Sequence, residues 1–285
     1  MAFDLIQNVS HSQIIMYSDM AVLMLRFAQI IGAQTPLFQN MVNYYLGQFF
    51  VNMGGNYEQY FDNIDSASPF YLFAQMQIDD SPRAMERILD KQPLFIPALN
   101  KLVSYRTASG DKSGALRIIN RALKNQKLSV EGRAYLIKRR ALVHLLFQDL
   151  NSAQRDIHEV SKTSDLDGEI LTVQARIWVA QGREIENAYD YAMAMIRKNP
   201  TNIVAWDTIA VVVASREGND AALEILEKVG GTANTCSSLF EHLGDAYMVK
   251  GDNKAAIAAY MRAIELSDDG LSVVPNIKKK IRKIK

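Results

Sequence analysis

The sequence predicts an all-α fold: a right-handed α-solenoid of about eight helical hairpins in series, followed by a C-terminal capping helix. Small and large apolar residues recur with a period of about 34 residues over most of the 285-residue chain. Glycine followed by Asp or Asn separates several of the periodic segments, which favours a helix end and a new helix start. No run of alternating apolar residues predicts a strand.

The clearest unit spans residues 237–270. With Ser237 as position 1, positions 4, 7, 8, 11, 15, 20, 24 and 27 are Phe240, Leu243, Gly244, Tyr247, Gly251, Ala256, Tyr260 and Ala263. This pattern resembles the tetratricopeptide repeat, a family of antiparallel helix pairs that stack side by side. Asp268 stands at position 32, where the family usually has proline.

Four further units precede this one and start at residues 96, 134, 169 and 203. All five units have alanine at position 20: Ala115, Ala153, Ala188, Ala222 and Ala256. The two helices of a hairpin cross at positions 8 and 20, where only a small side chain lets the backbones approach. We therefore expect these alanines in the core, with larger apolar residues at positions 4, 7, 11 and 24 between hairpins.

The first 95 residues show a looser version of the pattern. Leu46, Gly47, Phe50 and Gly54 match positions 7, 8, 11 and 15 of one unit. Residues 69–77 and 82–91 predict a shortened hairpin, and residues 3–13 and 19–33 predict another. The expected organisation is divergent hairpins over 1–95, a regular array over 96–270, and a basic amphipathic capping helix over 271–285.

A wider resemblance is carried by "DMAVLMLRFAQII", "NYYLGQFFVNMGGNYEQYF", "SPFYLFAQMQI" and "LFEHLGDAYMVKGDNKAAIAAYMRAIELS". In these stretches the chain is similar to the C-terminal part of alphaproteobacterial tetratricopeptide repeat proteins. The resemblance implies a bacterial scaffold. The chain as written indicates a cytoplasmic protein, and a fragment of an exported precursor would belong to the periplasm or envelope.

Composition and motifs favour a binding protein over an enzyme. The formal net charge of +1 gives no overall attraction to nucleic acid or to an anionic membrane. The single cysteine, Cys236, and the four histidines show no metal-ligand spacing. The chain contains no phosphate-binding loop, dinucleotide fingerprint or nucleophile elbow. We therefore expect no catalytic residue, no metal and no cofactor.

The expected function is a protein-interaction scaffold that binds a peptide or protein in the concave groove of the superhelix. Positions 2, 5, 9 and 12 of each first helix should line that groove. The candidates are Asn100, Ser104, Tyr135, Lys138, Leu142, Val173, Ile177, Asp207, Val211, Glu241 and Asp245. The alternative is a structural subunit of a bacterial assembly, associated with the envelope in an exported form, that contacts partners through its ends.

Other surfaces offer further hypotheses. A basic patch of Arg117, Arg121, Lys124, Arg139 and Arg140 could dock an acidic segment, with a solvated outer face as the competing interpretation. Nucleic acid is disfavoured, because no aromatic residues alternate with these cations. The basic tail allows weak membrane contact. Apolar residues near the start, such as Phe3 and Tyr17, predict self-association through the N-terminal end.

Overall fold

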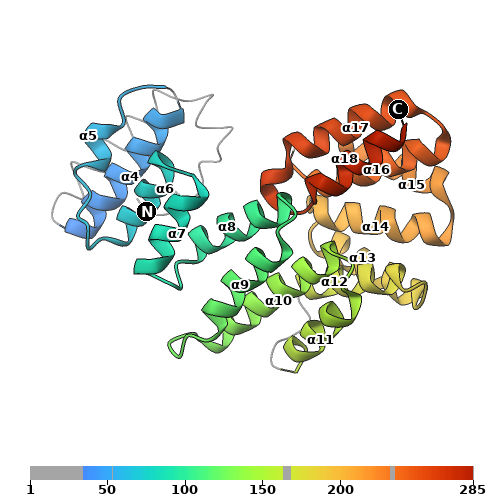
Figure 1. Cartoon of the computed structure of the whole chain (residues 1–285), viewed down its shortest axis with the longest axis horizontal. Coiled ribbons are helices and arrows are strands. Elements are labelled where there is room, and N and C mark those ends of the chain that lie inside the picture. The colour runs from blue at the N-terminus through green and yellow to red at the C-terminus, as the bar shows by residue number, and fades with distance from the viewer. Residues whose placement is uncertain (1–34, 53, 163–167, 232–234, 285) are drawn as a thin grey trace. The chain divides into compact units, whose positions relative to one another are not determined.

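The computed structural model describes residues 35–52, 54–162, 168–231 and 235–284. Their regular secondary structure is helical, and no strand occurs among them. They divide into two compact units at Lys91/Gln92, each of which is a series of helices (Figure 1). The hairpin expected over 3–33 and the proposed self-association surface lie outside the described residues.

The N-terminal unit contains a shortened version of the hairpin pattern. Its helices are α4 (Pro36–Asn52), α5 (Glu58–Phe61), α6 (Pro69–Ile78) and α7 (Pro82–Lys91). The last two match the helices predicted over 69–77 and 82–91. The helix that follows α4 is a single turn, α5, and α4 packs against both α5 and α6.

Aromatic side chains form the core of this unit. The Tyr44 ring lies 5.8 Å from the Phe70 ring and 6.4 Å from the Phe61 ring, measured between centroids. Gly47 packs directly against the Phe61 ring, and a Cβ atom at Gly47 would overlap that ring. A small residue at the predicted position 8 therefore lets α4 approach the turn that contains Phe61.

The second unit contains five consecutive hairpins. The pairs are α8 (Ile96–Ala108) with α9 (Lys112–Leu123), α10 (Val130–Leu146) with α11 (Leu150–Val160), α12 (Gly168–Ala180) with α13 (Ile185–Lys198), α14 (Ile203–Arg216) with α15 (Asn219–Gly230), and α16 (Ser237–Lys250) with α17 (Asn253–Glu265). Successive hairpins contact each other along the chain, which is the predicted solenoid arrangement.

The position-20 alanines occupy the predicted places. Ala115, Ala153, Ala188 and Ala256 are completely buried, and Ala222 is 2% exposed. At the same crossing in the last hairpin, a Cβ atom at Gly244 would lie 2.5 Å from the Tyr260 ring. The burial confirms that small residues permit the close contact between the two helices of each pair.

Some helices begin where the glycine–Asp and glycine–Asn pairs predict. The carboxylates of Asp111 and Asp252, which both follow a glycine, each accept a hydrogen bond from a backbone N–H in the first turn of the helix they precede. Asp149, which follows Gln148 and is not predicted by the glycine pattern, caps its helix in the same way. At Gly218-Asn219, where the same pattern predicts an Asn cap, the structure differs. Gly218 occupies the cap position, and the Asn219 side chain instead donates to the Ala246 carbonyl at 2.9 Å.

The segment after α17 returns to the first hairpin of the same unit. A short 3₁₀ helix, η1 (Ser267–Asp269), contacts α8, and the Ser104 hydroxyl donates to the Asp269 carbonyl at 3.2 Å. The Asp269 carboxylate accepts the Ser237 backbone N–H and hydroxyl at 2.7 and 2.6 Å. One turn thus contacts both the C-terminal half of α8 and the start of α16 (Figure 1).

The C-terminal helix α18 (Val274–Ile284) covers the last hairpin, as the isoleucine spacing predicts. Ile277 is fully buried against α16 and α17, and Ile281 and Ile284 pack against the same cluster. The helix begins three residues later than expected, because Asp269 and Gly270 first form the turn that leads into it. The isoleucine stripe faces the hairpin, and Lys280 beside it also contacts α16.

Candidate functional site

A pocket of about 460 Å³ opens within the second unit, and we call it the inner pocket. Its walls come from α10, α12, α14, α16 and α18, with the connection that leads into α18. It is lined by Leu145, Leu146, Gln148, Arg176, Val179, Ala180, Val211, Ser238, Glu241, His242, Leu271, Val273, Asn276, Lys279, Lys280 and Lys283. Four of the five first helices therefore meet the capping helix around one space.

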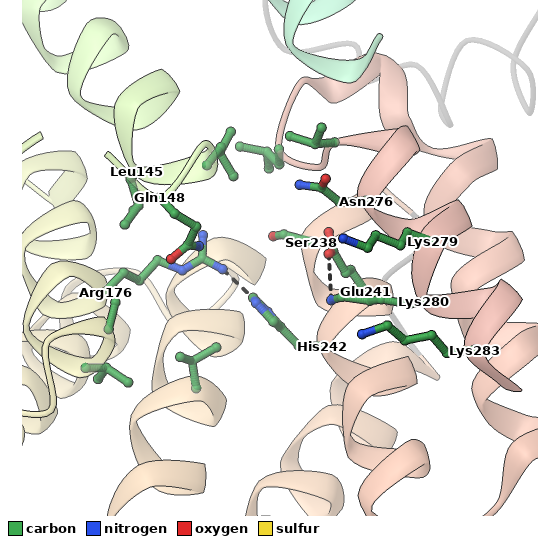
Figure 2. Close-up of a pocket in the computed structure, with 16 residues that line it drawn as sticks. Leu145, Gln148, Arg176, Ser238, Glu241, His242, Asn276, Lys279, Lys280 and Lys283 are labelled. Carbon is green, nitrogen blue, oxygen red and sulfur yellow. Dashed lines mark hydrogen bonds and ion pairs between the residues drawn. The ribbon is translucent and has the colours of Figure 1, made fainter. Parts of the chain in front are cut away.

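One wall of the inner pocket is cationic. Asn276, Lys279, Lys280 and Lys283 follow i, i+3, i+4, i+7 spacing on α18, so they share one face of the helix. Figure 2 shows these side chains pointing into the pocket toward Arg176 and Gln148 on the opposite wall. The predicted capping helix thus contributes a row of lysines to the site in addition to its apolar stripe.

Lys280 is engaged with carboxylates of the last hairpin. Its ammonium lies 2.8 Å from Glu241 Oε1 and 2.7 Å from Asp245 Oδ2, and 5.7 Å from the centre of the Tyr260 ring. Burial alone would lower the pKa of Lys280, but the two carboxylates outweigh burial and raise that pKa. Lys280 therefore stays charged and neutralises the acidic end of the predicted groove.

The opposite wall is built on a buried charged network. Asp207 is completely buried and accepts hydrogen bonds from Arg176 Nη2 at 2.7 Å, His242 Nδ1 at 2.6 Å and Ser238 Oγ at 2.6 Å. Burial acts to raise the pKa of Asp207, but His242 and Arg176 outweigh it and bring the pKa to about 2. The carboxylate therefore stays ionised and holds three side chains around the pocket floor.

This network does not form an activated nucleophile. Ser238 donates its proton to Asp207 and not to His242. Burial raises the pKa of the neighbouring Cys236 thiol to about 11, so that thiol is protonated at neutral pH. An imidazole held by a carboxylate is common to many hydrolases, but among the residues that the structure describes no hydroxyl or thiol is hydrogen-bonded to the His242 ring.

The pocket also has an apolar side, formed by Leu145, Val179 and Val211 with their neighbours. At its edge, Gln148 follows α10 with a φ angle of +59°, in the left-handed region. This position corresponds to position 15, which is glycine in two other units, Gly110 and Gly251. A glutamine in this conformation is strained, and its side chain points into the inner pocket (Figure 2).

The predicted groove residues are distributed over several environments. Val211 and Glu241 line the inner pocket, whereas Ile177 and Asp207 are fully buried behind its wall. Ser104 is buried beneath the turn that contains Asp269.

Three more candidates, Lys138, Leu142 and Val173, line a second pocket of about 580 Å³, which shares Arg176 and Leu271 with the first. Asn100 and Tyr135 are paired with each other by a hydrogen bond of 2.6 Å, and Asp245 pairs with Lys280.

The proposed basic patch does not form one continuous surface. Arg117, Arg121 and Lys124 are exposed on or just after α9. Arg139 lines the second pocket instead. Arg140 is bound within its own hairpin and to the hairpin before it, with Nη2 2.6 Å from Asp156 Oδ1 of α11 and Nη1 donating to Asn120 Oδ1 of α9 at 3.1 Å. These contacts hold the Arg140 side chain of α10 between α9 and α11.

Within the described ranges, no three His, Cys, Asp or Glu side chains come together as a metal-binding group. Among the helices that the structure describes, none combines the length and the apolar character needed to cross a bilayer.

Comparisons with known proteins place the fold. No family model and no curated protein matches the chain. Among solved structures, a tetratricopeptide repeat protein from Parabacteroides merdae is similar over 99% of this chain and 95% of its own, with a TM-score of 0.53 and 14% identity. A thermophilic tetratricopeptide repeat protein, TTC0263 from Thermus thermophilus, is 19% identical over 65% of this chain and 96% of its own, with a TM-score of 0.49. The chain has the fold of a tetratricopeptide repeat protein.

Proposed function

We propose that this protein is an interaction scaffold that binds a peptide segment of a partner protein in the inner pocket. The observation that carries the proposal is the pocket itself, a space of about 460 Å³ that is lined both by aliphatic side chains and by a row of lysines. Ligand sites are typically concave spaces of about 300–1,000 Å³ with mostly apolar linings and a few placed polar groups.

The fold supports this function. Arrays of helical hairpins offer their inner faces as binding surfaces, because each hairpin contributes one first helix to a shared concave side. In this chain those first helices converge with α18 on one pocket. Arg176, Ser238 and His242 are all hydrogen-bonded to Asp207, which suits a rigid binding wall.

A peptide-display selection on the purified full chain tests the proposal. Selected peptides should bind the wild-type chain and lose affinity when Val211 is replaced by Gln, which places an amide on the apolar side of the pocket. We expect a loss of about tenfold, equivalent to about 1.4 kcal/mol. Val249→Gln is the matched control, because Val249 is a 73% exposed valine of α16 that does not line the pocket.

Two outcomes contradict the proposal. A library that yields no binding peptide would do so, and so would selected peptides whose affinity is unchanged by Val211→Gln. The second outcome would place the binding surface outside the inner pocket, for instance at the ends of the hairpin array. Circular dichroism spectra of both variants establish that the helical fold is retained.

A further inference from the structure

The charges that line the inner pocket are unevenly compensated. Lys280 is neutralised by Glu241 and Asp245, and Arg176 is neutralised by the buried Asp207. These ion pairs belong to the pocket wall. They use the carboxylates near the lining, so none of the lining carboxylates remains to pair with the other lysines. Glu241 is the one acidic residue that lines the described pocket, and it is already bound to Lys280.

Lys279 and Lys283 are the cations that remain. Both are exposed, both line the pocket, and neither has an ion-pair partner among the residues that the structure describes. They lie at i and i+4 on α18, where two like charges destabilise the helix. Figure 2 shows both ammonium groups on the pocket side of the helix. Their arrangement therefore costs stability and provides two converging positive charges.

Gln148 gives an independent indication that this space binds a polar ligand. The residue holds a left-handed backbone conformation that glycine would adopt without strain. Strained residues that persist at the edge of a pocket are frequently part of a binding site. The Gln148 side chain faces the lysine row across the pocket, and its amide can donate a hydrogen bond to a carboxylate (Figure 2).

We infer that the inner pocket binds an acidic segment of the partner protein, with side-chain carboxylates that pair with Lys279 and Lys283 and aliphatic side chains that contact Val179 and Val211. The inference rests on the proposed function and adds the chemistry of the ligand. Charge complementarity of this kind sets partner choice and association rate. The apolar side of the pocket requires that the segment also carries aliphatic residues.

The same lysines would attract the phosphates of a nucleic acid, but the lining disfavours that ligand. Proteins that bind single strands combine cations with aromatic side chains on which bases stack. The lining of the inner pocket contains no Phe, Tyr or Trp, and its apolar side chains, among them Leu145, Val179 and Val211, are aliphatic. A peptide that carries both acidic and aliphatic residues can pair with the lysines and contact the aliphatic side chains of the lining.

The test uses the full chain and a displayed library of short random peptides whose C-termini are blocked by fusion. Selected peptides should carry a net charge of about −2 or lower and should bind more weakly as salt screens the lysines. Lys279→Glu combined with Lys283→Glu should weaken binding by about tenfold or more. The matched control is Lys278→Glu with Arg282→Glu, which makes the same charge change on α18 outside the pocket lining.

The outcomes separate this inference from the proposed function. Neutral or basic peptides that still depend on Val211 would overturn the inference and leave the scaffold function intact. Equal effects of the two double reversals would also overturn it. If a single-stranded oligothymidylate binds and depends on Lys279 and Lys283, nucleic acid replaces the acidic peptide. Should the double reversal unfold, Lys279→Gln with Lys283→Gln provides the same comparison without new negative charge.

Discussion

Ser104 and Gly270 pack against each other although 165 residues lie between them in the sequence. A Cβ atom built on Gly270 would lie 2.5 Å from the Ser104 hydroxyl and 2.6 Å from its Cα atom. Gly270 also has a φ angle of +72°, so two separate constraints require glycine. This contact joins the turn after the last hairpin to the first helix of the second unit.

The first prediction follows from that contact. Gly270→Ala should lower the free energy of unfolding by about 2–4 kcal/mol, because the methyl group adds a clash to the left-handed strain. Urea denaturation followed by circular dichroism measures the change. Gly251→Ala is the control, since Gly251 has a φ of +84° but open space around it. The control should lose only about 1 kcal/mol. Equal losses at both sites would show that the Ser104 contact contributes nothing.

A second prediction concerns the buried carboxylate of Asp207. Asp207→Asn keeps the size of the side chain but leaves Arg176 buried without its countercharge. We expect the free energy of unfolding to fall by about 2–5 kcal/mol at neutral pH. Urea denaturation of both proteins measures the difference.

The pH dependence of that difference has a definite sign. The pKa of Asp207 is about 2 in the folded chain against an ordinary value of 3.8. A depressed pKa stabilises the fold above the unfolded value, and this stabilisation is lost as pH falls from about 4 toward about 2. The gap between wild type and Asp207→Asn should therefore be constant above about pH 5 and shrink below about pH 4. A gap that shrinks near neutral pH instead would contradict this assignment.

A third prediction separates strain from binding at Gln148. Gln148→Gly should raise the free energy of unfolding by about 0.5–1 kcal/mol, because glycine adopts the left-handed conformation without the Cβ penalty. Glu184→Gly is the matched control: Glu184 has a φ of 52° but does not line the inner pocket. Both variants should become more stable, and only Gln148→Gly should bind acidic peptides more weakly. Loss of peptide affinity in both variants would contradict a role for the Gln148 side chain.

The hairpin array could be predicted because its determinants are local and repeated. Ala115, Ala153 and Ala188 recur at a fixed place in each unit, and each makes the same contact within its own hairpin. The isoleucine stripe of α18 was visible for the same reason, since Ile277 and Ile281 lie one turn apart. The spacing of residues in the sequence was enough to predict a contact wherever that contact joins segments close together in the chain.

The inner pocket could not be predicted in full because it joins segments far apart in sequence. Inner-face spacing identified Val211 and Glu241 as lining residues. It also placed Ile177 in the groove, but Ile177 is fully buried, because α10 and α14 both contact its helix, α12. The lysines of α18 were predicted as part of a cap. They also line the inner pocket, because η1 sets the direction in which α18 runs. A repeating sequence pattern carries no information about that direction.

A fourth prediction addresses how α18 is held. Lys280→Met should lower the free energy of unfolding by about 1 kcal/mol, because it leaves Glu241 and Asp245 as unpaired like charges one turn apart on α16. Combining it with Glu241→Gln in a double-mutant cycle should give a coupling free energy of about 0.5–1.5 kcal/mol that decreases with added salt. Thermal and urea unfolding at two salt concentrations supply the measurements.

The control for that cycle is Lys278→Met, a change of the same kind at an exposed position of α18. It should alter stability by less than about 0.5 kcal/mol. The methionine side chain retains an apolar stem, so the comparison isolates the charge from the packing of the stem. A coupling free energy of zero between Lys280 and Glu241 would mean that the isoleucine stripe alone holds the helix. In that case the lysine row would be free to reorient, and the cationic wall of the inner pocket would lose its defined geometry.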